Sequence, residues 1–244
     1  MKGQDVLRVA GYTVALGVLS EIVYTIYKRL IKKAVSKRDT TEVIFFPDSK
    51  VACVDFFTKP DGCVVRGCKF SHQDNSLSKL FMMLSKSTQS MDVCVFVMTC
   101  TDLTDLLIRA HWRGVRVRVI TDCEQEGATG SQVWRLRSEG IAVRTDESSF
   151  FMHHKFVVID GNTLINGSFN WTRQAITGNQ ENLLISNNHA LVTEYHKQFE
   201  YLWGLYDPGE VTLIYHRTKG RGTYSSQQPY AAYSIPQSEY LLGL

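Results

Sequence analysis

The sequence has little net charge, and most of that charge lies at one end. Across 244 residues, 27 Lys and Arg side chains oppose 24 Asp and Glu, which leaves a formal charge of +3. Residues 1–39 contain eight basic and three acidic side chains, a charge of +5, so the rest of the chain sums to −2. Because residues 40–244 have no excess positive charge, their overall charge would not attract a polyanion. Any such binding must use a local groove.

Cysteines are also few, and their placement argues against a secreted scaffold built on disulfides. Of the six, Cys94 lies in an apolar strand-like run, Cys100 follows that run and Cys123 follows another. We expect free thiols in a reducing compartment. No small-residue cleavage site precedes the basic run near the N-terminus, which disfavours a cleaved signal peptide.

One long apolar run is present, between Val9 and Tyr27. Its 19 residues, VAGYTVALGVLSEIVYTIY, are just enough to span a bilayer, and the acid Glu21 lies near one end. The basic sequence KRLIKKAVSKR follows at once and favours the cytosolic side. We therefore predict a single-pass transmembrane anchor with a basic flank over residues 1–39, and a cytosolic body. An amphipathic helix on the membrane surface is the alternative.

Four side chains that commonly bind zinc lie within the run CVDFFTKPDGCVVRGCKFSH at positions 53–72. They are Cys53, Cys63, Cys68 and His72. Three thiolates and one imidazole suit tetrahedral zinc, and a Pro-Asp-Gly turn at 60–62 brings Cys63 back toward the others. The spacing is close to that of CCCH zinc fingers, which predicts a small structural zinc site. The alternatives are unligated thiols on a loop and a disulfide between two of the cysteines.

The residues with a defined chemical pattern lie in the run FMHHKFVVIDGNTLINGSFNWTRQAITGNQENLLI. Its order is His-x-Lys, four residues, Asp, six residues, Gly-Ser-x-Asn, then an acid eleven residues on. The residues are His153, Lys155, Asp160, Ser168, Asn170 and Glu181. KFVVID predicts a strand and TLING its hairpin partner, with a turn at 161–162. Gly167 would permit close backbone approach beside Ser168.

These residue types suit the steps of phosphodiester cleavage. A neutral imidazole can attack phosphorus, so His153 is the candidate nucleophile. Lys155 supplies positive charge, while Ser168 and Asn170 supply hydrogen bonds. Glu181 is expected to hold a histidine Nδ1–H and fix its tautomer.

Two further residues of the run have other expected roles. Asp160 is expected either to pair with Lys155 or to fix the loop. His154 faces the other way on a strand, so we expect a structural or surface position for it.

The run resembles the HKD motif of the phospholipase D superfamily. MHHKFVVID and GSFNWT are most similar to the Zucchini-type mitochondrial phospholipases D, also called mitochondrial cardiolipin hydrolases. The resemblance implies a phospholipase D-like α/β/α sandwich over 40–215, with the zinc finger at 53–72 inserted. It implies that His153 is the nucleophile, that Lys155 and Asn170 bind phosphate and that Glu181 orients the histidine. It also implies a mitochondrial outer-membrane location for the anchor.

A single chain provides one motif, whereas a double displacement needs a nucleophile and a separate general acid. The other histidines lack a matching lysine and Gly-Ser-x-Asn context; they are His72, His111, His189, His196 and His216. We therefore predict a C2 homodimer that brings two copies of His153 to one cleft, with no catalytic metal. The superfamily resemblance implies the same arrangement, with a 5′-phosphate and a 3′-hydroxyl as products of nucleic acid cleavage.

The rest of the pattern predicts an α/β sheet with helices on both faces. Strands are expected over 41–46, 91–98, 115–121, 141–145 and 181–186, and helices over 76–87, 102–113, 131–139 and 188–205. Asp102 is expected to cap its helix, Gly114 to end it, and Leu191 to begin the buried stripe of the last helix. We expect a loop over 124–130. The tail over 216–244 contains Tyr, Ser, Gln and Gly and is predicted to be flexible.

Three functions remain open on the sequence. The first is a membrane-anchored endonuclease for single-stranded RNA or DNA. The second is a cardiolipin hydrolase that makes phosphatidic acid. The third is a membrane scaffold with a relic motif, against which the intact residue set argues. We favour the nuclease because the chain has the finger and lacks a second motif. The resemblance also points to piRNA precursors as substrate and piRNA-pathway proteins as partners.

Overall fold

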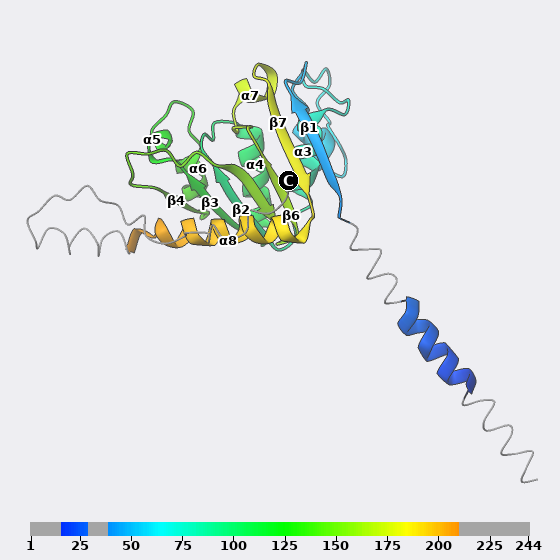
Figure 1. The fold of residues 1–244 in the computed structure, drawn as a ribbon. Helices are drawn as coiled ribbons and strands as arrows, with labels where there is room; N and C mark the ends of the chain where they lie inside the picture. Colours follow the sequence, from blue (N-terminus) through cyan, green and yellow to red (C-terminus); the bar gives the residue numbers. More distant parts are fainter. Residues whose placement is uncertain (1–15, 29–38, 210–244) are drawn as a thin grey trace, which may run out of the picture. The chain divides into compact units, whose positions relative to one another are not determined.

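The computed structural model describes residues 16–28 and 39–209, and a seven-stranded mixed sheet lies at its centre (Figure 1). The strand order is β1-β7-β6-β5-β2-β3-β4. The bounds are β1 (Thr41–Phe46), β2 (Ser90–Val95), β3 (Arg116–Thr121), β4 (Ala142–Thr145), β5 (Lys155–Ile159), β6 (Thr163–Gly167) and β7 (Glu181–Ser186). Strands β2, β3 and β4 are parallel, and each other neighbouring pair is antiparallel.

Helices cover both faces of this sheet, as the sequence pattern predicts. The bounds are α2 (Val54–Thr58), α3 (Ser76–Ser85), α4 (Thr101–Trp112), α5 (Cys123–Glu126), α6 (Val133–Ser138), α7 (Arg173–Thr177) and α8 (His189–Leu205). Buried residues of α3, α4, α6 and α7 belong to one core cluster, and those of α8 belong to a second. Figure 1 shows α8 running across the strands. The result is the predicted α/β architecture with two apolar cores separated by the sheet.

Helix α8 differs from its predicted form in the residues that face the sheet. Its N-cap is Asn188, whose side chain accepts a hydrogen bond from the Leu191 backbone N–H at 3.1 Å. Leu191 itself is 43% exposed, and Val192 takes its place in the buried stripe with Phe199. The predicted stripe was therefore wrong at its first residue because the capping turn points Leu191 away from the sheet.

Arg118 on β3 packs into the second core instead of facing solvent. Its guanidinium carbon lies 4.8 Å from the Phe199 ring and 5.2 Å from the Trp203 ring. The same group pairs with Asp92 at 2.8 Å and with Glu200 at 2.5 Å. Arg118 thus has a structural role, because its guanidinium group is occupied by two carboxylates and two aromatic rings.

Two local predictions are corrected at helix starts. Asp102 is not the cap of α4: Cys100 is in that position without a side-chain bond, and Asp102 pairs with Arg173 at 2.9 Å. The region predicted as a loop from residue 124 begins with the single-turn helix α5. Its N-cap Asp122 accepts a hydrogen bond from the Glu124 backbone N–H at 3.0 Å. Gly114 follows α4 with φ +88°, which agrees with its predicted role as a helix end.

The predicted anchor lies partly outside the described residues. Residues 16–28 are helical, whereas 1–15 and 29–38 fall outside the described ranges, as does the predicted tail at 216–244. Within 16–28 and 39–209 no helix has both the length and the apolar character needed to cross a membrane.

Candidate active site

The candidate catalytic residues come from strand ends that meet at one edge of the sheet. Lys155 begins β5, Ser168 follows β6 directly, and Glu181 begins β7. Because β5, β6 and β7 are successive antiparallel neighbours, the start of β5, the end of β6 and the start of β7 lie side by side. His153 lies two residues before β5, on the segment that leads into it.

Close packing of β6 against β7 requires a glycine at the end of β6. A Cβ on Gly167 would lie 2.0 Å from the carbonyl oxygen of Asn182, well inside any real contact. The backbone approach predicted for Gly167 is therefore present. It allows the Ser168 backbone N–H to donate to the Asn182 carbonyl and the Ser168 hydroxyl oxygen to accept from the Asn182 N–H, both at 3.1 Å.

Glu181 bonds to Ser168 and not to the histidine. The Ser168 hydroxyl donates to one carboxylate oxygen, and the Asn179 side-chain amide donates to the other at 3.0 Å. No hydrogen bond joins Glu181 to His153 within residues 39–209. The carboxylate also acts on Lys155, because its charge favours the ammonium form. The expected hold on the histidine Nδ1–H is absent from this single chain.

His153 and Lys155 lie together around an aromatic ring that the sequence analysis did not single out. The Lys155 ammonium donates to the His153 carbonyl oxygen at 2.7 Å and lies 5.1 Å from the centre of the Phe96 ring. The His153 ring lies 4.7 Å from that same ring, tilted by 55°. Phe96 follows β2, which pairs with β5, so only strand pairing reveals it.

The electrostatic environment favours a neutral histidine. The pKa of His153 lies below its ordinary value, first because of partial desolvation of the exposed ring and then because of the charge on Lys155, while Asp122 acts in the opposite direction. Burial also lowers the pKa of Lys155, and Glu181 opposes that shift. A lowered histidine pKa leaves a nitrogen lone pair available at neutral pH. Such a group is competent to attack phosphorus.

Asn170 lies two residues beyond Ser168, and its side-chain oxygen is buried without a hydrogen-bond partner in the described chain. The next residue is fixed in place: the Trp171 backbone N–H donates to the Val97 carbonyl at 3.0 Å, and its carbonyl accepts from Thr99 and Cys100. Asn170 is thus held near the loop that follows β2. Its amide nitrogen remains a candidate donor to a phosphate oxygen.

Asp160 lies away from these residues. It follows the far end of β5, five residues from Lys155, a separation of roughly 16 Å along a strand. Its carboxylate accepts from the backbone N–H groups of Thr88 at 3.0 Å, Gln89 at 2.7 Å and Ser90 at 2.9 Å. Of the two roles expected for it, these contacts agree with fixing the loop.

A groove of about 390 Å³ lies next to His153 on the side of α8. Its lining residues are Phe151, Met152, His153, His154, Leu202 and Tyr206. His154 meets the Phe156 ring edge to face at 5.5 Å, while Phe151 is 59% exposed. The groove therefore offers apolar and aromatic surface directly beside the candidate nucleophile.

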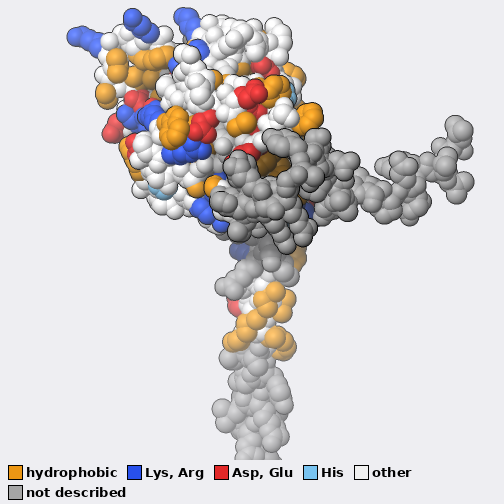
Figure 2. Space-filling model, turned by 90° about the vertical axis from the view of Figure 1, so that its left-hand side faces the viewer, with side chains coloured by type: hydrophobic (Ala, Val, Ile, Leu, Met, Phe, Trp, Pro, Cys, Tyr) orange, Lys and Arg blue, Asp and Glu red, His pale blue; other side chains and the backbone are white. Residues whose placement is uncertain are grey.

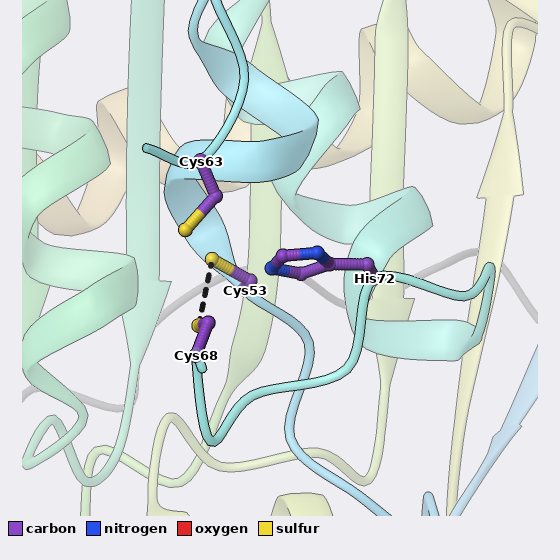
Figure 3. A group of neighbouring side chains, drawn as sticks. All are labelled: Cys53, Cys63, Cys68 and His72. Carbon is purple, nitrogen blue, oxygen red and sulfur yellow. Dashed lines mark hydrogen bonds between the residues drawn. The ribbon is translucent and has the colours of Figure 1, made fainter. Parts of the chain in front are cut away.

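The four predicted zinc ligands converge, as Figure 3 shows. One ligand atom from each lies within 4.8 Å of the others; the residues are Cys53, Cys63, Cys68 and His72. The sulfurs of Cys53 and Cys68 are 3.8 Å apart, close to the roughly 3.8 Å expected for two thiolates on tetrahedral zinc. Phe56 of α2 stacks on the His72 ring at 4.3 Å. The donor set and its spacing therefore fit a zinc ion.

The comparisons with known proteins agree with this fold and motif. A family model described as cardiolipin synthase, PLD-like domain, matches residues 80–203. The chain is 42% identical over 170 residues to a mitochondrial cardiolipin hydrolase of Chlamydomonas reinhardtii, covering 70% of this chain and 76% of the relative. It is 43% identical over 173 residues to that of Xenopus tropicalis, covering 70% and 80%. With the human protein it shares 38% over 187 residues, 73% of each chain.

The chain belongs to the phospholipase D superfamily. Within that superfamily it is similar to the proteins named mitochondrial cardiolipin hydrolase. The predicted family is therefore confirmed. The family assignment makes the chain a phosphodiesterase of the phospholipase D type.

Solved structures confirm the fold. Nuc, a phospholipase D family member from Salmonella typhimurium, aligns with a TM-score of 0.53 at 22% identity, over 68% of this chain and 95% of Nuc. NucT from Helicobacter pylori aligns with the same score at 17% identity, over 68% and 97%. At these identities the likeness is one of fold.

Proposed function

We propose that the protein cleaves phosphodiesters through a covalent intermediate on His153. The observation that carries this proposal is an exposed imidazole with a lowered pKa, placed beside Lys155 at the edge of the sheet. A ring nitrogen of His153 attacks phosphorus, and the bond from phosphorus to the leaving oxygen breaks. Lys155 and Asn170 stabilise the charge on the non-bridging oxygens. Water then displaces the histidine and releases the phosphate monoester.

The leaving oxygen needs a proton, which we assign to a second copy of the chain. In a C2 homodimer the partner's His153 would face the same phosphate and act as the general acid. After the first step it would be neutral and could take a proton from the attacking water. Glu181 would then orient a histidine only when two chains meet, which fits its lack of a bond to His153 within one chain.

The substrate we favour is single-stranded RNA, with DNA as a related substrate. Phe150 and Phe151, which precede the nucleophile, are 71% and 59% exposed, and such rings stack nucleobases without regard to sequence. On the face drawn in Figure 2, basic side chains are interspersed with acidic and apolar ones and do not form one broad basic surface. In keeping with the Zucchini resemblance, the substrates would be piRNA precursors cut to leave 5′-phosphates.

A second candidate is hydrolysis of cardiolipin to phosphatidic acid. The observation that favours it is that relatives 42–43% identical to this chain are named mitochondrial cardiolipin hydrolases. Phe151, Met152 and Leu202 in the lining of the groove next to His153 could also contact a lipid chain. Either substrate is compatible with a mitochondrial outer-membrane protein whose catalytic body faces the cytosol, the location that we propose.

We also propose that one structural zinc ion binds at Cys53, Cys63, Cys68 and His72. Burial raises the pKa of the Cys53 thiol to about 11, so a bound cation would be needed to keep it as a thiolate at neutral pH. The ion would hold the segment between β1 and α3 together and would not enter the reaction.

The test compares the two substrates with one preparation of full-length protein. Labelled single-stranded RNA and vesicles containing cardiolipin are each incubated with wild-type protein and with His153→Ala, followed by chromatography of the products. We expect 5′-phosphorylated RNA fragments from wild type only. If the wild-type protein releases phosphatidic acid and no RNA fragments, the nuclease assignment is wrong and the protein is a cardiolipin hydrolase. Turnover by the pure His153→Ala protein would overturn the shared mechanism.

A further inference from the structure

Behind the segment that leads to His153, the structure places two carboxyl groups and a thiol together. Asp122 follows β3 and Asp146 follows β4, and each is only 1% exposed. Cys123, next to Asp122, is half-buried. One carboxylate oxygen from each acid and the sulfur of Cys123 all lie within 4.8 Å of one another. This acid–thiol cluster shares no residue with the Cys3His site.

The cluster contains a polar atom that lacks a partner. One oxygen of Asp146 is buried with no hydrogen bond in the described chain, although the other accepts from the Cys123 backbone N–H at 3.0 Å. A buried carboxylate oxygen without a partner is costly. A positive ion at the centre would give this oxygen a partner.

We propose that Asp122, Cys123 and Asp146 form a second metal site that takes a zinc-like divalent cation. Two carboxylate oxygens and one thiolate make a donor set that such a cation accepts. Tetrahedral coordination places donors roughly 3–4 Å from one another, and the three donor atoms all lie within 4.8 Å of one another. Rotation of the half-buried Cys123 side chain can adjust these distances. Water would fill the remaining position.

The position of the cluster gives the cation a structural task. Asp146 lies at the start of the segment that leads to the candidate nucleophile. Near the end of that segment the Met152 backbone N–H donates to Asp122 at 3.0 Å. An ion that joins Asp122 to Asp146 would clamp both ends of residues 147–151, immediately before His153. The site is thus distinct from the proposed chemistry and can be tested by metal binding alone.

The test measures metal content in the full-length protein after equilibration with excess zinc and removal of unbound ion. The variants are Asp146→Asn, which keeps the side-chain shape, and Cys123→Ser. Glu147→Gln is the matched control, because Glu147 is an exposed acid next to Asp146. Cys68→Ser removes a ligand of the other site, so the two sites can be counted separately. Circular dichroism checks that each variant is folded.

We expect about two zinc ions per chain in wild type and Glu147→Gln, and about one in Asp146→Asn, Cys123→Ser and Cys68→Ser. With cobalt in place of zinc, Cys68→Ser should keep a thiolate-to-metal charge-transfer band that disappears when Cys123→Ser is added. This second measurement decides the matter if Asp146→Asn fails to fold, and the metal content of Asp146→Asn decides it if Cys123→Ser fails to fold. Unchanged metal content in Asp146→Asn and Cys123→Ser would overturn the site. A Cys68→Ser protein that binds no metal would do the same.

Discussion

The surroundings of His153 lower its pKa and so favour the neutral ring, and its protonation state sets the proposed reactivity. Burial and the Lys155 charge both lower its pKa. The Phe96 ring contacts both side chains and so limits how far either can turn. Three residues at the end of β2 and around the start of β5 thus define the surroundings of the nucleophile. In our proposal the lysine binds the phosphate and also favours the neutral form of the histidine.

Replacing Lys155 should therefore change the pH dependence as well as the rate. In Lys155→Met the charge that lowers the His153 pKa is gone, so that pKa rises toward its ordinary value. Because the neutral ring is the active form, the acid limb of kcat/KM should move to higher pH. The rate itself should fall by roughly 10²-fold or more, since a stabilising cation is lost. A pH–rate profile of cleavage measures both effects.

The matched control is Lys86→Met, which removes an exposed lysine at the end of α3. Its profile should coincide with that of wild type. An acid limb in Lys155→Met that stays in place, or moves to lower pH, would show that Lys155 does not set the protonation of the nucleophile.

At the scale of elements, the contact between β6 and β7 brings Ser168 to Glu181. Gly167→Ala would place a methyl group against the Asn182 carbonyl, and the strands would have to separate. We expect a loss of about 1–3 kcal/mol in the free energy of unfolding, together with lower activity because Ser168 and Glu181 move apart. Chemical denaturation and the cleavage assay measure the two losses.

Gly204→Ala in α8 provides the comparison, because nothing lies within 4 Å of its added Cβ. It should be neutral or stabilising by up to about 1 kcal/mol, as expected for alanine in a helix. Equal stability of the Gly167→Ala and Gly204→Ala proteins would contradict the close approach of β6 to β7.

The turn between β5 and β6 is fixed by Asp160, which has φ +52°. Burial tends to raise the Asp160 pKa, but hydrogen bonds from the backbone of Ser90, Gln89 and Thr88 outweigh it, so the pKa is lowered. A lowered pKa means that the carboxylate stabilises the fold above its unfolded pKa of about 3.9, and that this stabilisation is lost as pH falls through the folded pKa.

Asp160→Asn should thus unfold more easily at neutral pH, by about 1–2 kcal/mol. The difference from wild type should shrink as the pH is lowered below 4. Because Asp160 lies far from His153, the cleavage rate of the folded variant should stay within about twofold of wild type. Thermal unfolding against pH and a rate per folded molecule test this prediction. A large loss of rate at unchanged stability would return Asp160 to a catalytic role.

At the scale of the whole molecule, the proposal requires two chains for one reaction centre. Mixing wild-type and His153→Ala subunits should give heterodimers with a nucleophile but no acid, or the reverse. Activity should then fall roughly with the square of the wild-type fraction, as random pairing in a closed dimer requires. The measurement is cleavage rate against mixing ratio after verified subunit exchange. A linear fall would show that one chain works alone, and His154 would be the nearest candidate acid.

The features that the sequence determined by itself are those formed by residues near one another in the chain. The short apolar, β-branched run KFVVID, the turn after it and the segment TLING predict the β5–β6 hairpin, helical periodicity predicts α3, α4 and α8, and a glycine before Ser168 predicts a close backbone approach. The spaced motif identifies the family. These features depend on residues that are near one another in the chain, so their order is enough to reveal them.

Only the tertiary structure decided which distant groups meet. Phe96 reaches His153 because β2 pairs with β5, and Asp122 reaches Asp146 because β3 lies beside β4. Glu181 bonds to Ser168 and Asp160 bonds to residues 88–90 for the same reason. The order of strands in a sheet follows from how the whole chain packs. The motif therefore predicts the chemistry, and the packed sheet determines the partners that tune it.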